Sequence, residues 1–138
     1  MINYSFLVTK KNLNMNRNVD VELYINIISK IDIKDPIIGF VIKDSHGNLV
    51  TGGNTIIAKS NLQEIPAATN KKYLFKFVLP NFKSGYYFIS PAIAMGTQKN
   101  HIQLDWVNDA EIIKIDSKFE DCYLGWQVCL DKIEVEEI

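Results

Sequence analysis

The chain has 138 residues, of which 47% are hydrophobic and 22% charged, and its formal net charge is -1. This length suits one domain with a full hydrophobic core, and the near-neutral charge gives no bulk attraction to nucleic acid or to an anionic membrane. The apolar runs are only a few residues long, well short of the roughly 20 that span a bilayer. We therefore expect a single domain over residues 1–138, with no membrane span and no nucleic-acid partner.

The N-terminal part predicts two strands and a connection. Residues 4–8 are largely apolar, whereas residues 10–18 are polar and Asn-rich, which is typical of a connection. Residues 19–28 alternate between aliphatic and mainly polar side chains, the period of a strand with one buried face. With the odd positions in the core, Tyr24 and Asn26 stand beside each other on the outer face.

Residues 37–55 predict a β-hairpin around which the rest of the chain is arranged. Two apolar runs flank the tetrapeptide 45–48, a Gly- and Asn-bearing tight connection. Gly52 and Gly53 lie inside the second strand, where glycines indicate a bulge or the close approach of another backbone. We expect this strand to continue through residues 55–58.

The second half of the chain predicts a further hairpin and more strands. Residues 73–79 alternate with aromatic side chains on one face, and a short connection leads to residues 86–95, so these two segments are expected to pair. Pro91 interrupts the second segment and is therefore expected at an edge or a bulge. Residues 111–115 predict another short strand, and residues 126–135, which alternate imperfectly, predict the last one.

Residues 101–106 also alternate, and this pattern assigns their side chains to two faces. Ile102, Leu104 and Trp106 are expected to face the core, opposite to His101, Gln103 and Asp105. The chain thus contains eight or nine short strands separated by turn signals, with no helical period of useful length. This pattern predicts an all-β fold, a two-sheet antiparallel β-sandwich.

The two cysteines, Cys122 and Cys129, are expected to be reduced, packed thiols. The N-terminus lacks the basic leader and apolar block of a signal peptide, so we expect a cytoplasmic protein, where disulfides are rare. The alternative is a disulfide, which needs a turn near residues 124–125. Neither cysteine is accompanied by a set of zinc ligands, so no metal is expected.

No catalytic motif is present. The chain lacks GxSxG, HExxH and the Walker GxxxxGK[ST], which excludes the corresponding hydrolases, metalloproteases and nucleotide-dependent enzymes. Asp105 and Asp109 are the best candidates for the acid–base pair of a glycoside-cleaving or other glycan-modifying enzyme, but the simpler role for them is to cap a turn. We expect no enzymatic activity and no cofactor.

The outward-facing side chains indicate a sugar site. Sugars present apolar C–H patches next to hydroxyls, so they are bound by an aromatic platform beside planar hydrogen-bonding groups. Two sets on the predicted outer faces fit this description, and they are the candidate binding residues: Tyr24, Asn26, His101, Gln103 and Asp105. The alternative interpretation is an ordinary polar sheet face.

Three segments, taken in order, resemble a known family. The first has the pattern GFxIxDxxG followed by an Asn-Thr pair, here residues 39–47 and 54–55. The second has an FxLP strand and a GxY hairpin, here residues 77–80 and 85–87, and the third has Asp-Trp at residues 105–106. Together they resemble the C-terminal carbohydrate-binding domain of Wzt, the ATP-binding subunit of ABC transporters that export O-antigen polysaccharide. The resemblance covers residues 19–116.

The resemblance implies an immunoglobulin-like sandwich that recognises the finished end of a lipid-linked O-antigen glycan before export. It also implies a cytoplasmic, dimeric setting at the inner face of the inner membrane, beside the membrane subunit of an ABC transporter. The chain has no Walker motif of its own, so we interpret it as one domain of a larger subunit. The resemblance does not assign binding residues, because these vary with the glycan.

One hypothesis about a partner chain follows, and one rival function remains. We expect a homodimer in which the C-terminal strand, residues 126–135, pairs with a partner chain. Linked weak sites would then gain affinity by avidity. The rival from another class is a structural or protein-interaction sandwich that uses an exposed sheet edge.

Overall fold

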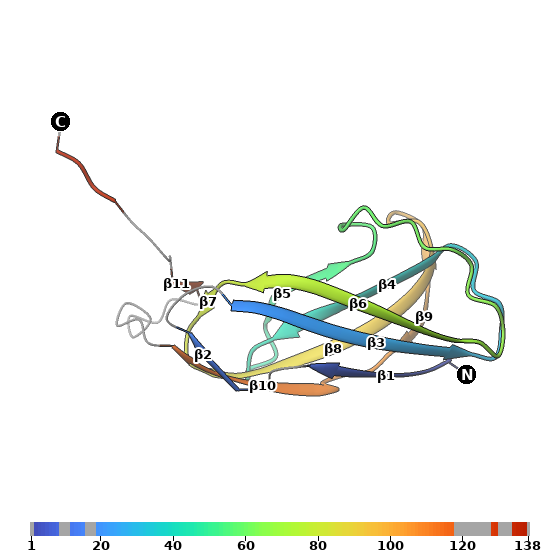
Figure 1. The fold of residues 1–138 in the computed structure, drawn as a ribbon, viewed down its shortest axis with the longest axis horizontal. Coiled ribbons are helices and arrows are strands. Elements are labelled where there is room, and N and C mark those ends of the chain that lie inside the picture. Colours follow the sequence, from blue (N-terminus) through green and yellow to red (C-terminus); the bar gives the residue numbers. More distant parts are fainter. Residues whose placement is uncertain (1, 9–11, 16–18, 118–127, 130–133, 138) are drawn as a thin grey trace.

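The protein is a β-sandwich of two main sheets (Figure 1). The computed structural model describes residues 2–8, 12–15, 19–117, 128–129 and 134–137. The strands are β1 (Ile2–Val8), β2 (Asn12–Met15), β3 (Val19–Ser29), β4 (Pro36–Lys43), β5 (Leu49–Asn54), β6 (Asn70–Leu79), β7 (Asn81–Phe82), β8 (Gly85–Gly96), β9 (His101–Trp106), β10 (Glu111–Ser117) and β11 (Val128–Cys129). The predicted all-β sandwich is confirmed.

The two sheets differ in size. The three-stranded sheet has the order β1-β3-β6, and the six-stranded sheet has the order β2-β10-β8-β4-β5 with β9 also paired to β8. β11 pairs with β7 apart from both sheets. Within the described residues, no helix is long and apolar enough to cross a membrane.

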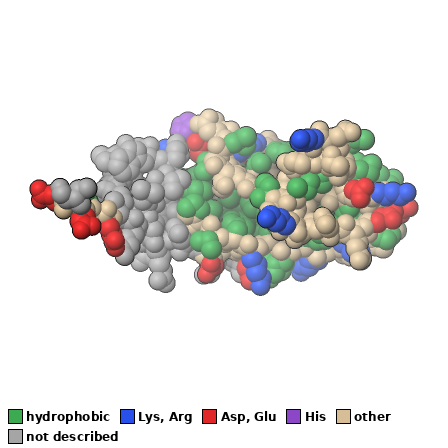
Figure 2. Space-filling view, turned by 90° about the horizontal axis from the view of Figure 1, so that it is seen from above, with side chains coloured by type: hydrophobic (Ala, Val, Ile, Leu, Met, Phe, Trp, Pro, Cys, Tyr) green, Lys and Arg blue, Asp and Glu red, His purple; other side chains and the backbone are tan. Residues whose placement is uncertain are grey.

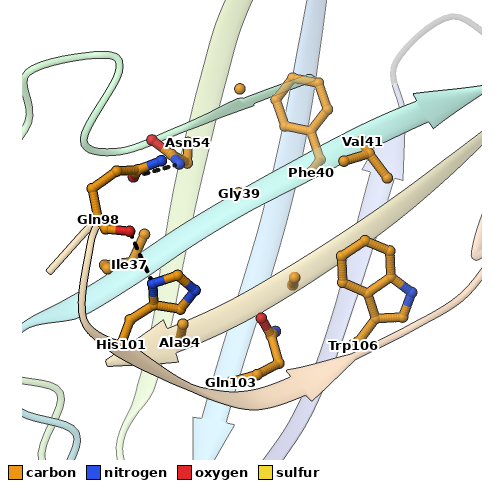
Figure 3. A pocket seen from close by; sticks show the side chains of 12 residues that line it. Ile37, Gly39, Phe40, Val41, Asn54, Ala94, Gln98, His101, Gln103 and Trp106 are labelled. Carbon is orange, nitrogen blue, oxygen red and sulfur yellow. Dashed lines mark hydrogen bonds between the residues drawn. The ribbon is translucent and has the colours of Figure 1, made fainter. Parts of the chain in front are cut away.

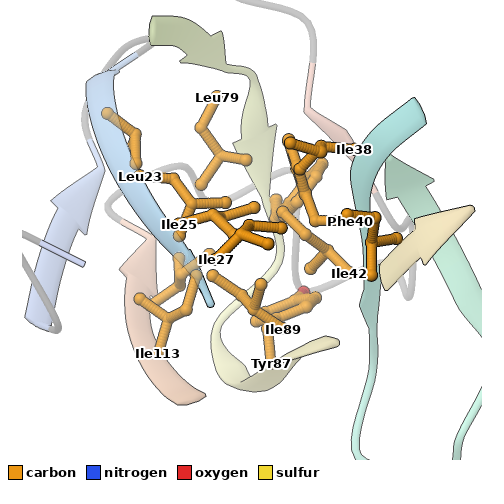
Figure 4. Packing of buried hydrophobic residues seen from close by; sticks show 14 of the residues in the cluster. Leu23, Ile25, Ile27, Ile38, Phe40, Ile42, Leu79, Tyr87, Ile89 and Ile113 are labelled. Atoms are coloured by element: carbon orange, nitrogen blue, oxygen red, sulfur yellow. The ribbon is translucent and has the colours of Figure 1, made fainter. Parts of the chain in front are cut away.

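The core lies between the two sheets and follows the predicted alternation (Figure 4). From Val21 to Ser29, β3 buries its odd positions, and Leu23 is fully buried among them. The aromatic rings of β6 pack against β4: the centroids of Phe40 and Phe77 are 5.0 Å apart in a stacked arrangement, and those of Phe40 and Phe75 are 5.6 Å apart edge to face. Aromatic pairs of this kind contribute beyond their buried area, so Phe40 connects the two sheets.

The Asn-rich segment predicted to be a connection contains a strand. β2 pairs in parallel with β10, in the register Asn12 to Lys114 through Met15 to Ser117. The prediction was wrong here because a ladder uses backbone N–H and C=O groups, so asparagine side chains do not prevent pairing at a sheet edge.

The predicted β4–β5 hairpin is confirmed, including its turn. The Asp44 carboxylate accepts hydrogen bonds from the backbone N–H of His46 and of Asn48, each at 2.9 Å, and these bonds lower the pKa of that carboxyl. Gly47 has a φ of 81°, a left-handed conformation that favours glycine. The strands also approach closely at Gly52, as expected, whereas the bulge lies between Ile42 and Lys43.

The second strand of this hairpin ends earlier than predicted. Residues 55–59 form turns, not the expected continuation of the strand. The side-chain oxygen of Asn54 accepts a hydrogen bond from the Ile57 N–H at 2.8 Å, and the Asn54 carbonyl accepts one from the Ala58 N–H at 3.0 Å. A side chain that bonds the backbone ahead of it in this way favours a turn over a strand.

The predicted second hairpin is wrong. β6 belongs to the three-stranded sheet and β8 to the six-stranded sheet, so the segment between them crosses from one sheet to the other. The sequence pattern of a strand, a short connection and a second strand is the same for a hairpin and for such a crossover. Pro80 and β7 occupy the crossover.

Pro91 lies in the middle of β8, at a change of pairing partner. One side of β8 pairs with β4 from Phe88 to Met95, whereas the other side pairs with β10 up to Ile89 and with β9 from Ala92. The Pro91 carbonyl accepts a hydrogen bond from the Val107 N–H at 3.0 Å, in the segment that joins those two partners. The proline therefore occupies a gap in the ladder, where its missing N–H is tolerated.

Tyr87 fixes the start of β8. Its hydroxyl donates a hydrogen bond of 2.7 Å to the Lys83 carbonyl while its ring is buried beside Phe82. Burial, assisted by the nearby Asp44 carboxylate, raises the pKa of Tyr87 to about 12. Such a tyrosine, bonded to backbone a few residues upstream, is typical of immunoglobulin-like sandwiches.

The C-terminal predictions fall largely outside the described residues. Of the predicted strand 126–135, the structure describes β11, which pairs with β7 of the same chain, and part of an exposed stretch at 134–137 that extends from the end of the sandwich. Acidic side chains mark this end of the molecule (Figure 2). Cys122 lies outside the described residues, so the expected state of the two thiols stays a prediction.

The two neighbouring glycines of β5 provide a test of the hairpin packing. A Cβ added at Gly52 would lie 2.5 Å from the Phe40 carbonyl oxygen, whereas one at Gly53 would make ordinary contacts of 3.8 Å with the Phe40 ring. We expect Gly52→Ala to lower the free energy of unfolding by about 1–3 kcal/mol, since backbone atoms must shift. Gly53→Ala is the matched control, with a much smaller expected change. Chemical denaturation measures both, and equal losses would contradict the packing described.

Candidate functional site

A hollow of about 180 Å³ lies on the outer face of the six-stranded sheet, over β4, β8 and β9 and beside the end of β5 (Figure 3). We call it the sheet hollow. Small residues line its base, namely Gly39, Ala92 and Ala94. A Cβ added at Gly39 would lie 2.7 Å from the Gly53 carbonyl oxygen. The hollow therefore exists because side chains are minimal where three strands meet.

One extra residue in β9 determines which side chains surround the sheet hollow. Ala92 pairs with Trp106, but Ala94 pairs with Gln103, so Leu104 is left without a partner in the ladder. Such a bulge reverses the alternation of side chains beyond it. Trp106, which strict alternation assigned to the core, is 43% exposed and lines the sheet hollow together with Gln103. The expectation of a core position for Trp106 is therefore wrong.

The amide of Gln103 is held in one orientation. Its nitrogen donates to the Ile93 carbonyl at 3.1 Å and to the Asp105 carbonyl at 2.8 Å. Both acceptors are carbonyl oxygens, which identifies the nitrogen and occupies both of its hydrogens. The remaining amide oxygen is a fixed acceptor on the wall of the sheet hollow. It is suited to a ligand hydroxyl.

His101 and two amides form the opposite wall. Nδ1 of His101 lies 3.0 Å from the Thr97 carbonyl and 3.2 Å from the Gln98 carbonyl. Since both oxygens only accept, Nδ1 carries a proton, and the neutral ring then has Nε2 as an acceptor. The Asn54 amide donates to the Gln98 side-chain oxygen at 3.2 Å, which fixes the Gln98 amide nitrogen as a further donor. This wall thus offers both a donor and an acceptor.

A polar network lies beside Trp106. The Lys43 ammonium lies 5.7 Å from the centroid of the Trp106 ring and donates to the Asn108 side-chain oxygen at 2.7 Å. The backbone N–H of Asp109 donates to the hydroxyl of Ser90 at 2.8 Å, and Ser90 is fully buried. The Lys43 ammonium over the indole, together with the hydrogen-bonded turn at residues 108–109, restricts the orientation of the Trp106 ring.

The structure divides the five predicted site residues among three places. His101 and Gln103 line the sheet hollow together. Asp105 does not line it: its carboxylate accepts a hydrogen bond from the Trp106 N–H at 2.8 Å, as a turn-type local contact. Tyr24 and Asn26 lie on β3, in the other sheet of the sandwich.

The surroundings of Tyr24 differ from those of Trp106. The Lys72 ammonium lies 5.1 Å from the centroid of the Tyr24 ring, and the Tyr24 hydroxyl donates to the Glu22 carboxylate at 3.2 Å. The hydrogen bond to Glu22 and its charge raise the pKa of the Tyr24 hydroxyl. A lysine ammonium of the same sheet thus lies over each ring, and Tyr24 differs from Trp106 in that a neighbouring carboxylate holds its polar end.

Sequence reasoning missed Asn54, Gln98 and Trp106, which also line the sheet hollow. Asn54 belongs to the Asn-Thr pair of the family pattern, which marks no site, and Gln98 lies in a connection without periodicity. For Trp106 the available signal was its position as the last residue of the strand. A bulge near a strand end changes the face of only the one or two residues that follow it, so the face of Trp106 was the least certain of the strand.

The electrostatics of the sheet hollow favour an uncharged ligand. Among the described residues that line it there is no Asp, Glu, Lys or Arg. In the part of the chain that the structure describes, no group of three or more His, Cys, Asp or Glu side chains is placed to hold a metal ion. The arrangement of an indole, two acceptors and one donor around a base of small residues matches the chemistry of a sugar ring.

Comparisons with known proteins identify one family. The model of the Wzt C-terminal domain family matches residues 2–124. The crystal structure of a Wzt C-terminal domain is similar with a TM-score of 0.79 and 18% identity, covering 97% of this chain and 81% of that one. Among curated proteins, no match was found.

Two other solved structures are similar at a lower level. An X-ray structure of a structural genomics target has a TM-score of 0.49 and 12% identity, covering 99% of this chain and 96% of its own. A CARDB domain from Pyrococcus furiosus, in complex with di-metal ions, has a TM-score of 0.45 and 12% identity, covering 84% and 88%. These scores are too low to support conclusions about this chain.

The fixed amide of Gln103 provides a test of the site's construction. In Gln103→Glu, a carboxylate would face the Ile93 and Asp105 carbonyls without a hydrogen to donate, so we expect the free energy of unfolding at neutral pH to fall by about 1–3 kcal/mol. Gln98→Glu is the matched control, because the oxygen that accepts from Asn54 is retained. Denaturation measures both variants. Equal stability of the two would contradict the orientation assigned to Gln103.

Proposed function

The chain belongs to the Wzt C-terminal domain family, and from this premise we propose that it recognises, without catalysis, the terminal part of a lipid-linked O-antigen polysaccharide. Recognition would give substrate specificity to export by the ABC transporter. The observation that carries the proposal is the sheet hollow, where an exposed indole and oriented polar groups surround a base of small residues.

The proposed binding mode follows from those groups. An apolar face of a sugar stacks on Trp106, while its hydroxyls donate to the amide oxygen of Gln103 and to Nε2 of His101 and accept from the amide of Gln98. The base of glycine and alanine admits the ring edge without displacing a side chain. Water competes for each hydroxyl contact in so open a site, so the affinity of a single site is weak.

The proposed setting is that of the family. We place the chain at the cytoplasmic face of the inner membrane, as one domain of an ATP-binding subunit that works with a membrane subunit. In this setting the domain binds the glycan and thereby supplies the specificity of export. The hydrolysis of ATP belongs to the rest of such a subunit.

A second candidate function rests on the free edges of the sandwich. β5 and β6 are end strands of their sheets in the described part of the fold. A hollow of about 260 Å³ lies between them, lined mainly by apolar groups such as Phe75, Ile57 and Val78. Exposed edges of this kind are used for pairing with another polypeptide, so a protein-interaction role is the alternative.

Substitutions on the two sheets distinguish these proposals. We expect Trp106→Ala to weaken binding of the source bacterium's own O-polysaccharide at least tenfold, because truncating an aromatic side chain that anchors a ligand costs about 2 kcal/mol. Tyr24→Ala is the matched aromatic control on the other sheet. Isothermal titration calorimetry measures both.

Three outcomes are informative. A loss in Trp106→Ala alone supports the sheet hollow. A loss in Tyr24→Ala alone moves the site to the three-stranded sheet, where Tyr24 and Asn26 lie. No binding by the unaltered protein favours the protein-interaction function.

We also propose that the chain acts as a homodimer through its C-terminal strand, residues 126–135. Avidity between two linked sites would compensate for the weak affinity of each. We expect sedimentation equilibrium to show a dimer that shortening of this strand converts to monomer. A monomer for the unaltered chain at high concentration would contradict the proposal.

A further inference from the structure

A second hollow, of about 510 Å³, lies at the end of the six-stranded sheet where β4 begins. We call it the loop-end hollow, because the segments that follow β5 and β8 form its walls. It shares two lining residues, Ile37 and Gln98, with the sheet hollow. The two hollows are therefore neighbours along the same outer face, and Gln98 stands at the boundary between them.

The loop-end hollow presents hydroxyl and amide groups. Its polar lining consists of Asp35, Thr55, Ser60, Asn61, Thr97 and Gln98. In the part of the chain that the structure describes, the side chains of Ser60 and Asn61 have no hydrogen-bond partner. Unengaged polar side chains on a concave surface are available to a ligand.

β4 runs beneath both hollows. From Pro36, at the loop-end hollow, to Val41, at the sheet hollow, the strand covers about 16 Å at its rise of ~3.3 Å per residue. This length exceeds a single sugar ring. The Gln98 amide, held by Asn54, lies on the path from one hollow to the other and can contact sugars on both sides.

Charge restricts what the loop-end hollow accepts. Among the described residues that line it, Asp35 is the sole ionisable side chain, and none is Lys, Arg or His. A carboxylate accepts hydrogen bonds from hydroxyl, amide or ammonium groups and repels acidic substituents. The lining therefore suits neutral or amino sugars and disfavours acidic ones.

We propose that the loop-end hollow is a second sugar subsite, so that the site binds a run of at least two glycan residues and not only the terminal sugar. The subsite takes uncharged or amino sugars, which hydrogen-bond to Asn61, Ser60 and Asp35. This inference rests on the proposed function, since it assigns a further part of the same glycan.

The test uses oligosaccharide fragments from partial hydrolysis of the source bacterium's O-polysaccharide, graded by length, and methyl glycosides of its component sugars. We expect the unaltered chain to bind the longer fragments more tightly than any single glycoside. Asn61→Ala should weaken binding of the longer fragments roughly fivefold, the effect of one hydrogen bond, and leave the glycosides unaffected. Gln63→Ala is the matched control, an exposed amide of the same segment outside the lining.

A further variant tests the charge. Asp35 has a φ of 48°, a left-handed conformation that asparagine also adopts, so Asp35→Asn removes the charge while keeping the backbone. We expect this variant to bind carboxyl-bearing uronic acid oligosaccharides at least twofold more tightly than the unaltered chain does.

The outcomes separate this inference from the proposed function. Equal affinity for glycosides and longer fragments, or equal effects of Asn61→Ala and Gln63→Ala, would overturn the second subsite while binding in the sheet hollow stands. Absence of binding by every fragment would overturn both. Unchanged binding of uronic acid oligosaccharides by Asp35→Asn would overturn the assigned charge preference.

Discussion

The unpaired Leu104 in β9 determines what the outer face of the six-stranded sheet presents. In a regular ladder the side chain of Trp106 would point to the opposite side from those of His101 and Gln103. The extra residue turns it to their side, and the Gln103 amide in turn donates to carbonyls on both strands of the bulge. The irregularity of the backbone and the orientation of the polar group thus support each other, which is typical of bulges at functional positions.

The remaining features of the site follow from how the two sheets are held. Aliphatic and aromatic side chains fill the space between the sheets, so the outer face is not required for the core. That independence allows β4 and β8 to present glycine and alanine at the base of the sheet hollow without loss of internal packing. Gly39 leaves space at the base of the sheet hollow and also allows β5 to lie close to β4, since a Cβ at this position would lie too near the Gly53 carbonyl oxygen.

Features that depend on local sequence pattern could be predicted from the sequence. Features that depend on which strands pair with each other could not. The alternation of residues 19–28, the turn at 45–48 and the sandwich itself were predicted correctly, because periodicity and turn chemistry specify them. The second hairpin and the Asn-rich connection were predicted wrongly, since which strands pair is set by the whole fold. At the candidate site, the strand pattern placed His101 and Gln103 on one face, and both line the sheet hollow; that they bind a sugar stays a prediction. Trp106 was assigned to the wrong face because a single-residue bulge leaves no periodic signal.

The central claim is that the outer face of the six-stranded sheet binds a specific glycan. The most direct measurement is a two-dimensional NMR titration of the chain with O-polysaccharide from its own source and from an unrelated strain. We expect saturable shifts with the cognate glycan alone, located on β4, β8 and β9 around Trp106 and Gln103. Shifts with neither glycan, or shifts confined to the three-stranded sheet, would contradict it.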